Sequence, residues 1–134
     1  MSKSLIVQKY GGTSVGTLER IEHVADRIDK VRKAGVDIVV VVSAMAGETD
    51  KLLKMACSLS KNPARREVDM LLSSGERISA ALLTLALQSR GISAFSMTGR
   101  QIGLQTDSTH TRARITKVDA RRASKMLNEN HVIV

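Results

Sequence analysis

The stretch VQKYGGTSVG, Val7 to Gly16, joins a short apolar run to an amphipathic segment through two glycines and two hydroxyl residues. The β-prone run from Ser4 to Lys9 predicts a strand, which the glycine pair ends. Thr13 and Ser14 are both suited to cap a helix. Beyond them, until Gly35, apolar residues recur at helical spacing at Leu18, Ile21, Ala25 and Ile28. The stretch therefore predicts a strand, a glycine turn and a helix.

The same pattern repeats immediately afterwards. The run Ile38 to Val42 is apolar on both faces, as expected of a parallel strand covered by helices. It leads into Ser43 to Gly47, and a second helix is predicted over Leu52 to Leu59. The first unit is a βαβ unit, which we expect to be right-handed. Because parallel strands end at a common edge of the sheet, both glycine loops should open there, where such sheets bind ligands.

The remaining segments continue the alternation of helices and strands. We expect a helical region from Pro63 to Gly91, a strand at Ile92 to Met97, a loop or hairpin at Thr98 to Asp107, a short strand at Ala113 to Val118, a helix at Ala120 to Asn130 and the beginning of a strand at His131 to Val134. This order predicts an α/β fold, a three-layer αβα sandwich with a mainly parallel central sheet. The stop after so short a strand favours a truncated chain over a natural terminal strand.

Length and composition restrict the class of protein. The 134 residues suffice for one domain. No apolar run of 18 residues and no secretion signal occur, so we expect a cytoplasmic protein without membrane contact. The single cysteine, Cys57, excludes an internal disulfide and has no metal-ligand companions, so no metal site is expected. His23, His110 and His131 carry no motif and are interpreted as surface residues.

The net charge of +8 arises mostly after residue 89, where 8 Lys and Arg face 3 Asp and Glu. Such an excess suits nucleic acid, an anionic small molecule or an acidic protein surface. Proteins that bind single strands usually add stacking aromatic residues, whereas this chain has one Tyr, one Phe and no Trp. We therefore expect no nucleic-acid partner.

The glycine loops are suited to bind phosphate. Glycines let an anion approach backbone N–H groups and positive helix ends, and Lys9 adds a full positive charge. Gly11 and Gly16 have the GxxxxG spacing of a Walker A loop, but Thr17 follows where lysine is required, and GxGxxG is absent. Simple tight turns remain the alternative interpretation.

Four segments together resemble the N-terminal part of the bacterial aspartokinase family, which has the amino-acid kinase fold. In chain order they are KYGGTSV (9–15), VVSAMAGETD (41–50), DMLLSSGERIS (69–79) and TGRQIGLQTD (98–107). The resemblance implies transfer of the ATP γ-phosphoryl group to the β-carboxylate of L-aspartate, with Mg²⁺ balancing phosphate charge and without a Walker A loop.

The resemblance also implies roles for single residues. Lys9 matches the catalytic lysine that neutralises charge on the γ-phosphoryl group. The residues that match nucleotide and phosphate contacts are Lys9, Tyr10, Gly11, Gly12, Thr13, Ser14 and Ser43. Those that match the aspartate pocket are Gly47, Thr49 and Glu76, the last as partner of the α-ammonium group. Thr49 is also placed to cap the following helix, and Glu76 could be an ordinary exposed helix glutamate.

The chain also departs from the family. It lacks a Gly-Gly-Ser-Asp segment, the nucleotide-binding half and the regulatory ACT domains. Residues 1–134 are thus expected to be the substrate-side half of a kinase domain, inactive alone. Expected partners are L-aspartate, ATP, and either a second copy or the remainder of the kinase. The alternative is a non-catalytic module that binds aspartate or supports assembly.

Overall fold

A computed structural model describes residues 3–134 of the chain. The elements in order are β1 (Leu5–Tyr10), α1 (Leu18–Lys33), β2 (Asp37–Val42), α2 (Glu48–Leu59), α3 (Arg65–Gln88), β3 (Ala94–Phe95), β4 (Leu104–Thr106), β5 (Ile115–Val118), α4 (Arg121–Asn128) and β6 (Val132–Ile133). Their types and order agree with the predicted alternation of helices and strands.

The central sheet has the order β1-β2-β6-β3, and every pair in it is parallel. β1 and β2 pair along their whole length, from Leu5 opposite Asp37 to Tyr10 opposite Val42. β6 joins the two halves of the sheet, because Ile133 pairs with Val39 of β2 and also with Phe95 of β3. The predicted parallel sheet is confirmed, with the last strand of the chain in its interior.

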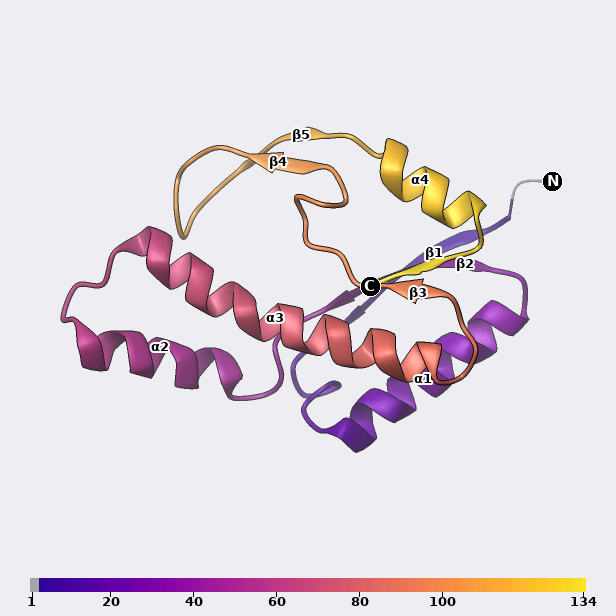
Figure 1. Ribbon diagram of the computed structural model, residues 1–134, viewed down its shortest axis with the longest axis horizontal. Coiled ribbons are helices and arrows are strands. Elements are labelled where there is room, and N and C mark those ends of the chain that lie inside the picture. Colours follow the sequence, from indigo (N-terminus) through magenta and orange to yellow (C-terminus); the bar gives the residue numbers. More distant parts are fainter. Residues whose placement is uncertain (1–2) are drawn as a thin grey trace.

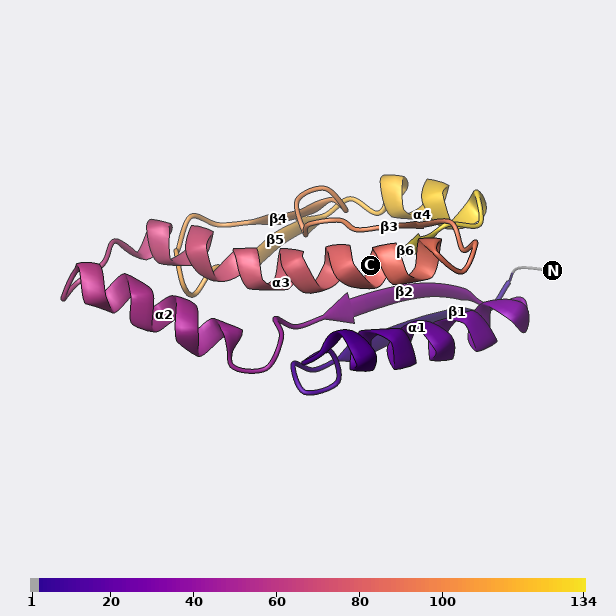
Figure 2. The same ribbon diagram turned by 60° about the horizontal axis from the view of Figure 1, so that its bottom comes forward.

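The helices cover both faces of the sheet. In Figures 1 and 2, α1 and α3 lie on one face, whereas α4 and the β4–β5 hairpin lie on the other. The strand order explains this division. The chain moves across the sheet in one direction from β1 through β2 to β3 and then returns to β6, so right-handed connections place α4 opposite α1 and α3. The fold is the predicted three-layer α/β arrangement.

The main core lies between the sheet and the α1–α3 layer. Alternate residues of β2, Ile38 and Val40, are buried on this face, and Leu83 and Leu87 of α3 are fully buried against it. α1 contributes the predicted helical face, which consists of Ile21, Val24, Ala25 and Ile28. Apolar burial of this kind is the main favourable term in folding and fixes the helices on the sheet.

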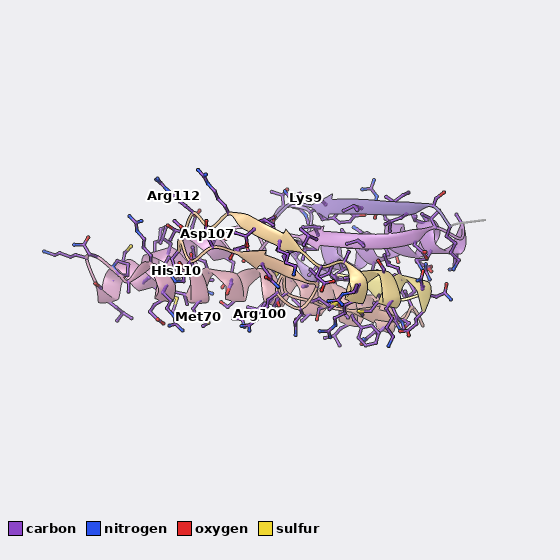
Figure 3. All side chains as sticks on the ribbon, turned by 90° about the horizontal axis from the view of Figure 1, so that it is seen from above. Lys9, Met70, Arg100, Asp107, His110 and Arg112 are labelled. Carbon is purple, nitrogen blue, oxygen red and sulfur yellow. The ribbon has the colours of Figure 1, made fainter. Side chains whose placement is uncertain are left out.

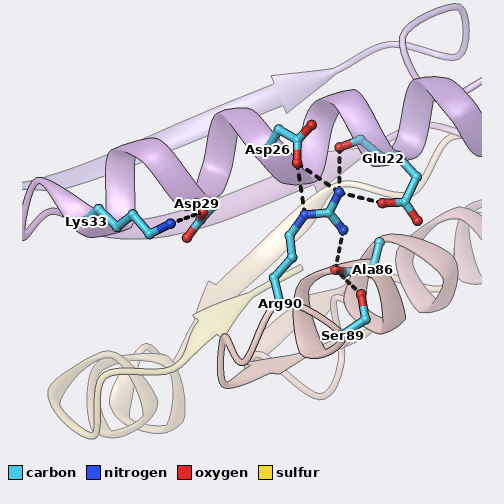
Figure 4. A network of polar contacts seen from close by, with 7 residues as sticks. All are labelled: Glu22, Asp26, Asp29, Lys33, Ala86, Ser89 and Arg90. Atoms are coloured by element: carbon cyan, nitrogen blue, oxygen red, sulfur yellow. Dashed lines mark hydrogen bonds and ion pairs between the residues drawn. The ribbon is translucent and has the colours of Figure 1, made fainter.

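An arginine near the end of α3 joins the two helices of this layer. The Arg90 guanidinium lies 2.5 Å from Glu22 Oε2 and 2.8 Å from Asp26 Oδ1, both on α1, and donates to the carbonyl of Ala86 (Figure 4). The hydrogen bonds with Glu22 and then Asp26 raise the pKa of Arg90. This network joins the C-terminal end of α3 to α1.

Part of the opposite face is open. In β1 and β2, Leu5, Val7 and Val41 are between 45% and 64% exposed on the side away from α1. α4 packs against β6 and leaves these three side chains uncovered by any part of residues 3–134. A contiguous apolar surface of this kind is typical of an interaction site.

α3 is long and apolar enough to cross a membrane by length and composition alone. Its buried residues, however, pack against α1 and the sheet, as in the core helix of a globular domain.

Several local predictions need correction. The cap of α1 is Thr17, whose Oγ1 accepts the N–H of Arg20, and not Thr13 or Ser14. The strand predicted from Ile92 to Met97 is reduced to two residues, because β3 pairs only with the short β6.

Two of the histidines are exposed as predicted, but His131 is not. Its side chain is 24% exposed, lies 2.7 Å from Ser93 Oγ and packs edge-on against Phe95.

Candidate functional site

The two glycine loops meet at the carboxyl edge of the sheet. Ser43 N–H donates to the Tyr10 carbonyl at 3.1 Å, and Ala46 N–H donates to the Gly12 carbonyl at 3.2 Å. A side chain on Gly12 would place its Cβ only 2.8 Å from the Ala44 carbonyl oxygen. Glycine is therefore required there for the loops to approach. The prediction that both loops open on one edge is confirmed.

The first loop is a compact turn. Ser14 N–H donates to the Gly11 carbonyl at 2.9 Å, and the buried Val15 anchors the loop to the core. Arg20 of α1 reaches back and donates to the Thr13 carbonyl at 2.5 Å. The Thr13 and Ser14 side chains remain exposed. The prediction from sequence missed Arg20, because a side chain one turn into a helix carries no sign of a bond to the preceding loop.

Lys9 lies near the end of β1, on the face turned away from α1, paired in register with Val41. Figure 3 labels it at this edge of the sheet. Its side chain is exposed and makes no hydrogen bond or ion pair with any of residues 3–134. A full positive charge is thus held on a rigid strand without an internal counter-charge.

Tyr10, the next residue, points the other way. Its ring belongs to the core, and its hydroxyl donates to Gln8 Oε1 at 3.0 Å. Burial raises the pKa of the Tyr10 hydroxyl, opposed by the positive charge of Arg27. The predicted phosphate contact of Tyr10 is not supported by its side chain, because neighbouring residues of a strand face opposite sides.

The second loop leads directly into α2. Ser43 is half-buried, and Gly47 is the residue before the helix, with a φ of 81°. Thr49 is the second residue of α2, so the alternative that it caps this helix is wrong. No side chain caps this end. Glu48 N–H donates to the Met45 carbonyl at 3.0 Å, which leaves the N–H groups of the next residues as possible donors to an anion.

Glu76 reaches the same region from α3. The preceding residue, Gly75, is buried where α3 crosses the second loop, and a Cβ on it would lie 2.9 Å from the Ala44 side chain. This close crossing places Glu76 beside the second loop. Its carboxylate is exposed and has no hydrogen-bond partner among residues 3–134. An uncompensated negative charge therefore lies at the same edge as Lys9.

No group of three His, Cys, Asp or Glu side chains in residues 3–134 lies close enough to hold a metal ion.

The chain is similar in sequence and fold to known proteins. The model of the amino acid kinase family matches residues 4–134. The aspartate kinase of Stutzerimonas stutzeri is 52% identical over 98% of this chain, and the aspartokinase of Geobacillus stearothermophilus is 48% identical over 97%. The crystal structure of aspartate kinase from Synechocystis covers 98% of this chain at 50% identity, with a TM-score of 0.86.

The chain belongs to the amino acid kinase family. It spans 32% of the length of each of the two curated relatives and 21% of the Synechocystis chain. E. coli aspartokinase III, solved in complex with aspartate and ADP, is only 22% identical and shows the same fold with a TM-score of 0.76.

Proposed function

We propose that this chain forms the substrate-side part of an aspartate kinase, which transfers the ATP γ-phosphoryl group to the β-carboxylate of L-aspartate and gives 4-phospho-L-aspartate. The observation that carries the proposal is that both glycine loops meet at the edge of the sheet where Lys9 lies near the end of β1 and where α3 crosses the second loop next to Glu76. The relatives that bear the name aspartate kinase support the choice of substrate.

Lys9 supplies electrostatic stabilisation in this reaction. Phosphoryl transfer depends mainly on the position of the reactants and on neutralisation of charge that shifts during the transfer. A cation on a rigid strand, without an internal partner among residues 3–134, is available for the transferred group. The backbone N–H groups of the two loops and of α2 add further donors for phosphate oxygens.

Glu76 orients the amino acid. L-Aspartate carries an α-ammonium group, and a fixed carboxylate can pair with it through charge-assisted hydrogen bonds. The pairing would hold the β-carboxylate towards Lys9 and the phosphate loops. Gly47 and Thr49, at the start of α2, would complete this pocket.

Mg²⁺ would travel with ATP, bound by phosphate oxygens, because the described residues supply no metal cluster. ATP use is supported by the ADP complex of E. coli aspartokinase III. We place the protein in the cytoplasm, where both substrates occur. The open apolar face of β1 and β2 would be covered by a second copy or by further parts of a kinase.

A second candidate function is a non-catalytic module that binds aspartate. The observation in its favour is that Gly47, Thr49 and Glu76, the residues assigned to aspartate, all lie within residues 3–134.

Calorimetric titration of the chain with L-aspartate and with succinate, which lacks the ammonium group, tests the pocket. Wild-type chain should prefer L-aspartate, and Glu76→Gln should lose about tenfold in affinity for L-aspartate only. Glu67→Gln, another exposed glutamate on α3, is the matched control and should change neither affinity.

A parallel assay of aspartate-dependent ADP release separates the two candidate functions. Aspartate binding together with ADP release supports the function of a kinase. Aspartate binding without ADP release, also in any longer form of the protein, supports the function of a non-catalytic module. If Glu76→Gln weakens ATP binding and spares aspartate, the pocket assignment is wrong.

A further inference from the structure

Within residues 3–134, the hydrogen bonds between the β4–β5 hairpin and α3 all end on one side chain, that of Asp69. Asp69 Oδ2 accepts the backbone N–H of Thr111 at 2.9 Å and lies 3.2 Å from Nδ1 of His110, a distance at which a protonated Nδ1 donates. Thr111 and His110 form the tip of the hairpin, 41 or more residues from Asp69 in sequence. Figures 1 and 3 show the hairpin extending beyond the carboxyl ends of β1 and β2 towards the first turns of α3.

The tip itself is a preformed turn. Asp107 Oδ1 accepts the N–H of Thr109 at 2.9 Å and that of Arg114 at 3.3 Å, and the Asp107 N–H donates to the Arg114 carbonyl. These backbone hydrogen bonds, the one from Thr109 first, lower the pKa of Asp107. The tip can therefore move as one unit.

The hairpin has little else to hold it in place. All residues from Gln105 to Val118 are exposed, including the apolar side chains of Ile115 and Val118. A two-stranded hairpin without a buried face is marginally stable by itself. Of the hydrogen bonds within residues 3–134, the only ones that join the hairpin to α2 or α3 end on Asp69.

The contact also involves a strained residue. Thr111 has a φ of 66°, in the left-handed region that β-branched residues rarely adopt. Such a conformation persists only where the surroundings impose it. The Thr111 N–H that reaches Asp69 is part of that constraint.

We propose that Asp69 is a positioning residue that fastens the hairpin across the carboxyl edge of the sheet, where it forms one wall of the site for aspartate and ATP. This inference rests on the proposed function. The hairpin and the loop before it carry three guanidinium groups, on Arg100, Arg112 and Arg114, with no carboxylate partner among residues 3–134. A fastened hairpin adds their positive charge to the edge that holds Lys9, which favours anionic substrates.

Hydrogen exchange of the backbone amides tests the fastening in the chain itself. In Asp69→Ala, the amides of Thr111 and its neighbours at the tip should exchange about tenfold faster or more, because a charge-assisted hydrogen bond is lost. Asp69→Asn keeps an oxygen for the Thr111 N–H and should retain part of the protection. Glu67→Gln, two residues away on α3, is the control and should exchange like the wild type.

Titration with L-aspartate tests the wall. Asp69→Ala should weaken aspartate binding severalfold, and Asp69→Asn should weaken it less. The variant whose tip amides exchange faster should thus also lose more affinity for aspartate. Protection of the α3 amides shows that the variants are folded.

Two results would overturn the proposal. Unchanged exchange at the tip in Asp69→Ala would show that the hairpin is held by other contacts. Faster exchange with unchanged affinity for aspartate would show that the hairpin is no wall of the site. If the wild-type chain itself binds no aspartate, the proposed function fails and the wall fails with it, while the exchange rates still decide whether Asp69 fastens the hairpin.

Discussion

The two edges of the central sheet differ in whether their charged side chains are paired within the described residues. At the amino edge, Arg32 and Asp37 are 16% and 13% exposed and form an ion pair at 3.0 Å, and Arg32 also donates to the Asn130 carbonyl. At the carboxyl edge, Lys9 and Glu76 are exposed without a partner among residues 3–134. Charges that are paired internally hold the fold together, whereas charges left without partners are available to a ligand.

The largest effect is expected from loss of the free cation. Lys9→Ala should lower the rate of aspartate-dependent ADP release at least about a hundredfold in any active form of the protein, because the charge acts where negative charge shifts during transfer. Its stability should change little, since Lys9 is exposed. Lys30→Ala, on the exposed surface of α1, is the control. If Lys9→Ala unfolds, Lys9 contributes to the fold, and the contrast between paired structural charges and unpaired ligand-binding charges is wrong.

Removal of the ion pair at the amino edge should lower the stability of the fold and leave substrate binding unchanged. Arg32→Ala should cost about 2 kcal/mol in the free energy of unfolding, because it leaves Asp37 and the Asn130 carbonyl without their donor. Urea denaturation measures this loss. Aspartate affinity should be unchanged, and a variant as stable as wild type would show that this ion pair contributes nothing.

The contact between the two glycine loops can be tested with neighbouring residues. Gly12→Ala would bring a methyl group against the Ala44 carbonyl and should cost about 1–2 kcal/mol. Gly11→Ala has no atom within 4 Å of its new methyl and should stay within about 0.5 kcal/mol of wild type. Equal losses of stability would mean that the loops do not rely on this close approach.

The smallest effect concerns pH. Bonding to Arg121 holds the pKa of Asp119 well below its ordinary 3.8, so the ionised carboxylate stabilises the fold at higher pH and this contribution is lost as pH falls below 3.8. Asp119→Asn should therefore be slightly less stable than wild type at neutral pH, with a gap that narrows below pH 3.8. A gap that is constant with pH would contradict this role.

Much of the fold follows from local pattern. The apolar runs and glycine turns predict β1, α1, β2 and the shared edge, because strand and helix periodicities appear within a few residues. The cap of α1 was predicted at Thr13 or Ser14 and lies instead at Thr17, because several hydroxyl residues precede the helix and only the backbone conformation selects one of them. The place of β6 between β2 and β3 depends on pairing across long separations and has no local signal.

The candidate site divides in the same way. Resemblance assigns roles to Lys9 and Glu76, which stay predictions, and it cannot show that Tyr10 faces the core, because a motif does not record which face of a strand a side chain takes. The contact between Asp69 and the hairpin tip joins residues more than 40 positions apart and became visible only in the folded chain.

The position of β6 has a consequence for how the chain folds. Val132 is hydrogen-bonded to Ser93, and Ile133 pairs with both Val39 and Phe95, so the last strand in sequence joins two parts of the sheet that do not otherwise touch. Such pairings close loops of very different length, and long loops slow folding. Within residues 3–134, β1, α1 and β2 can form first, but β3 has no partner strand until β6 is in place. We therefore expect a slow, late folding phase, in which the α3–β3 part docks only when β6 is inserted.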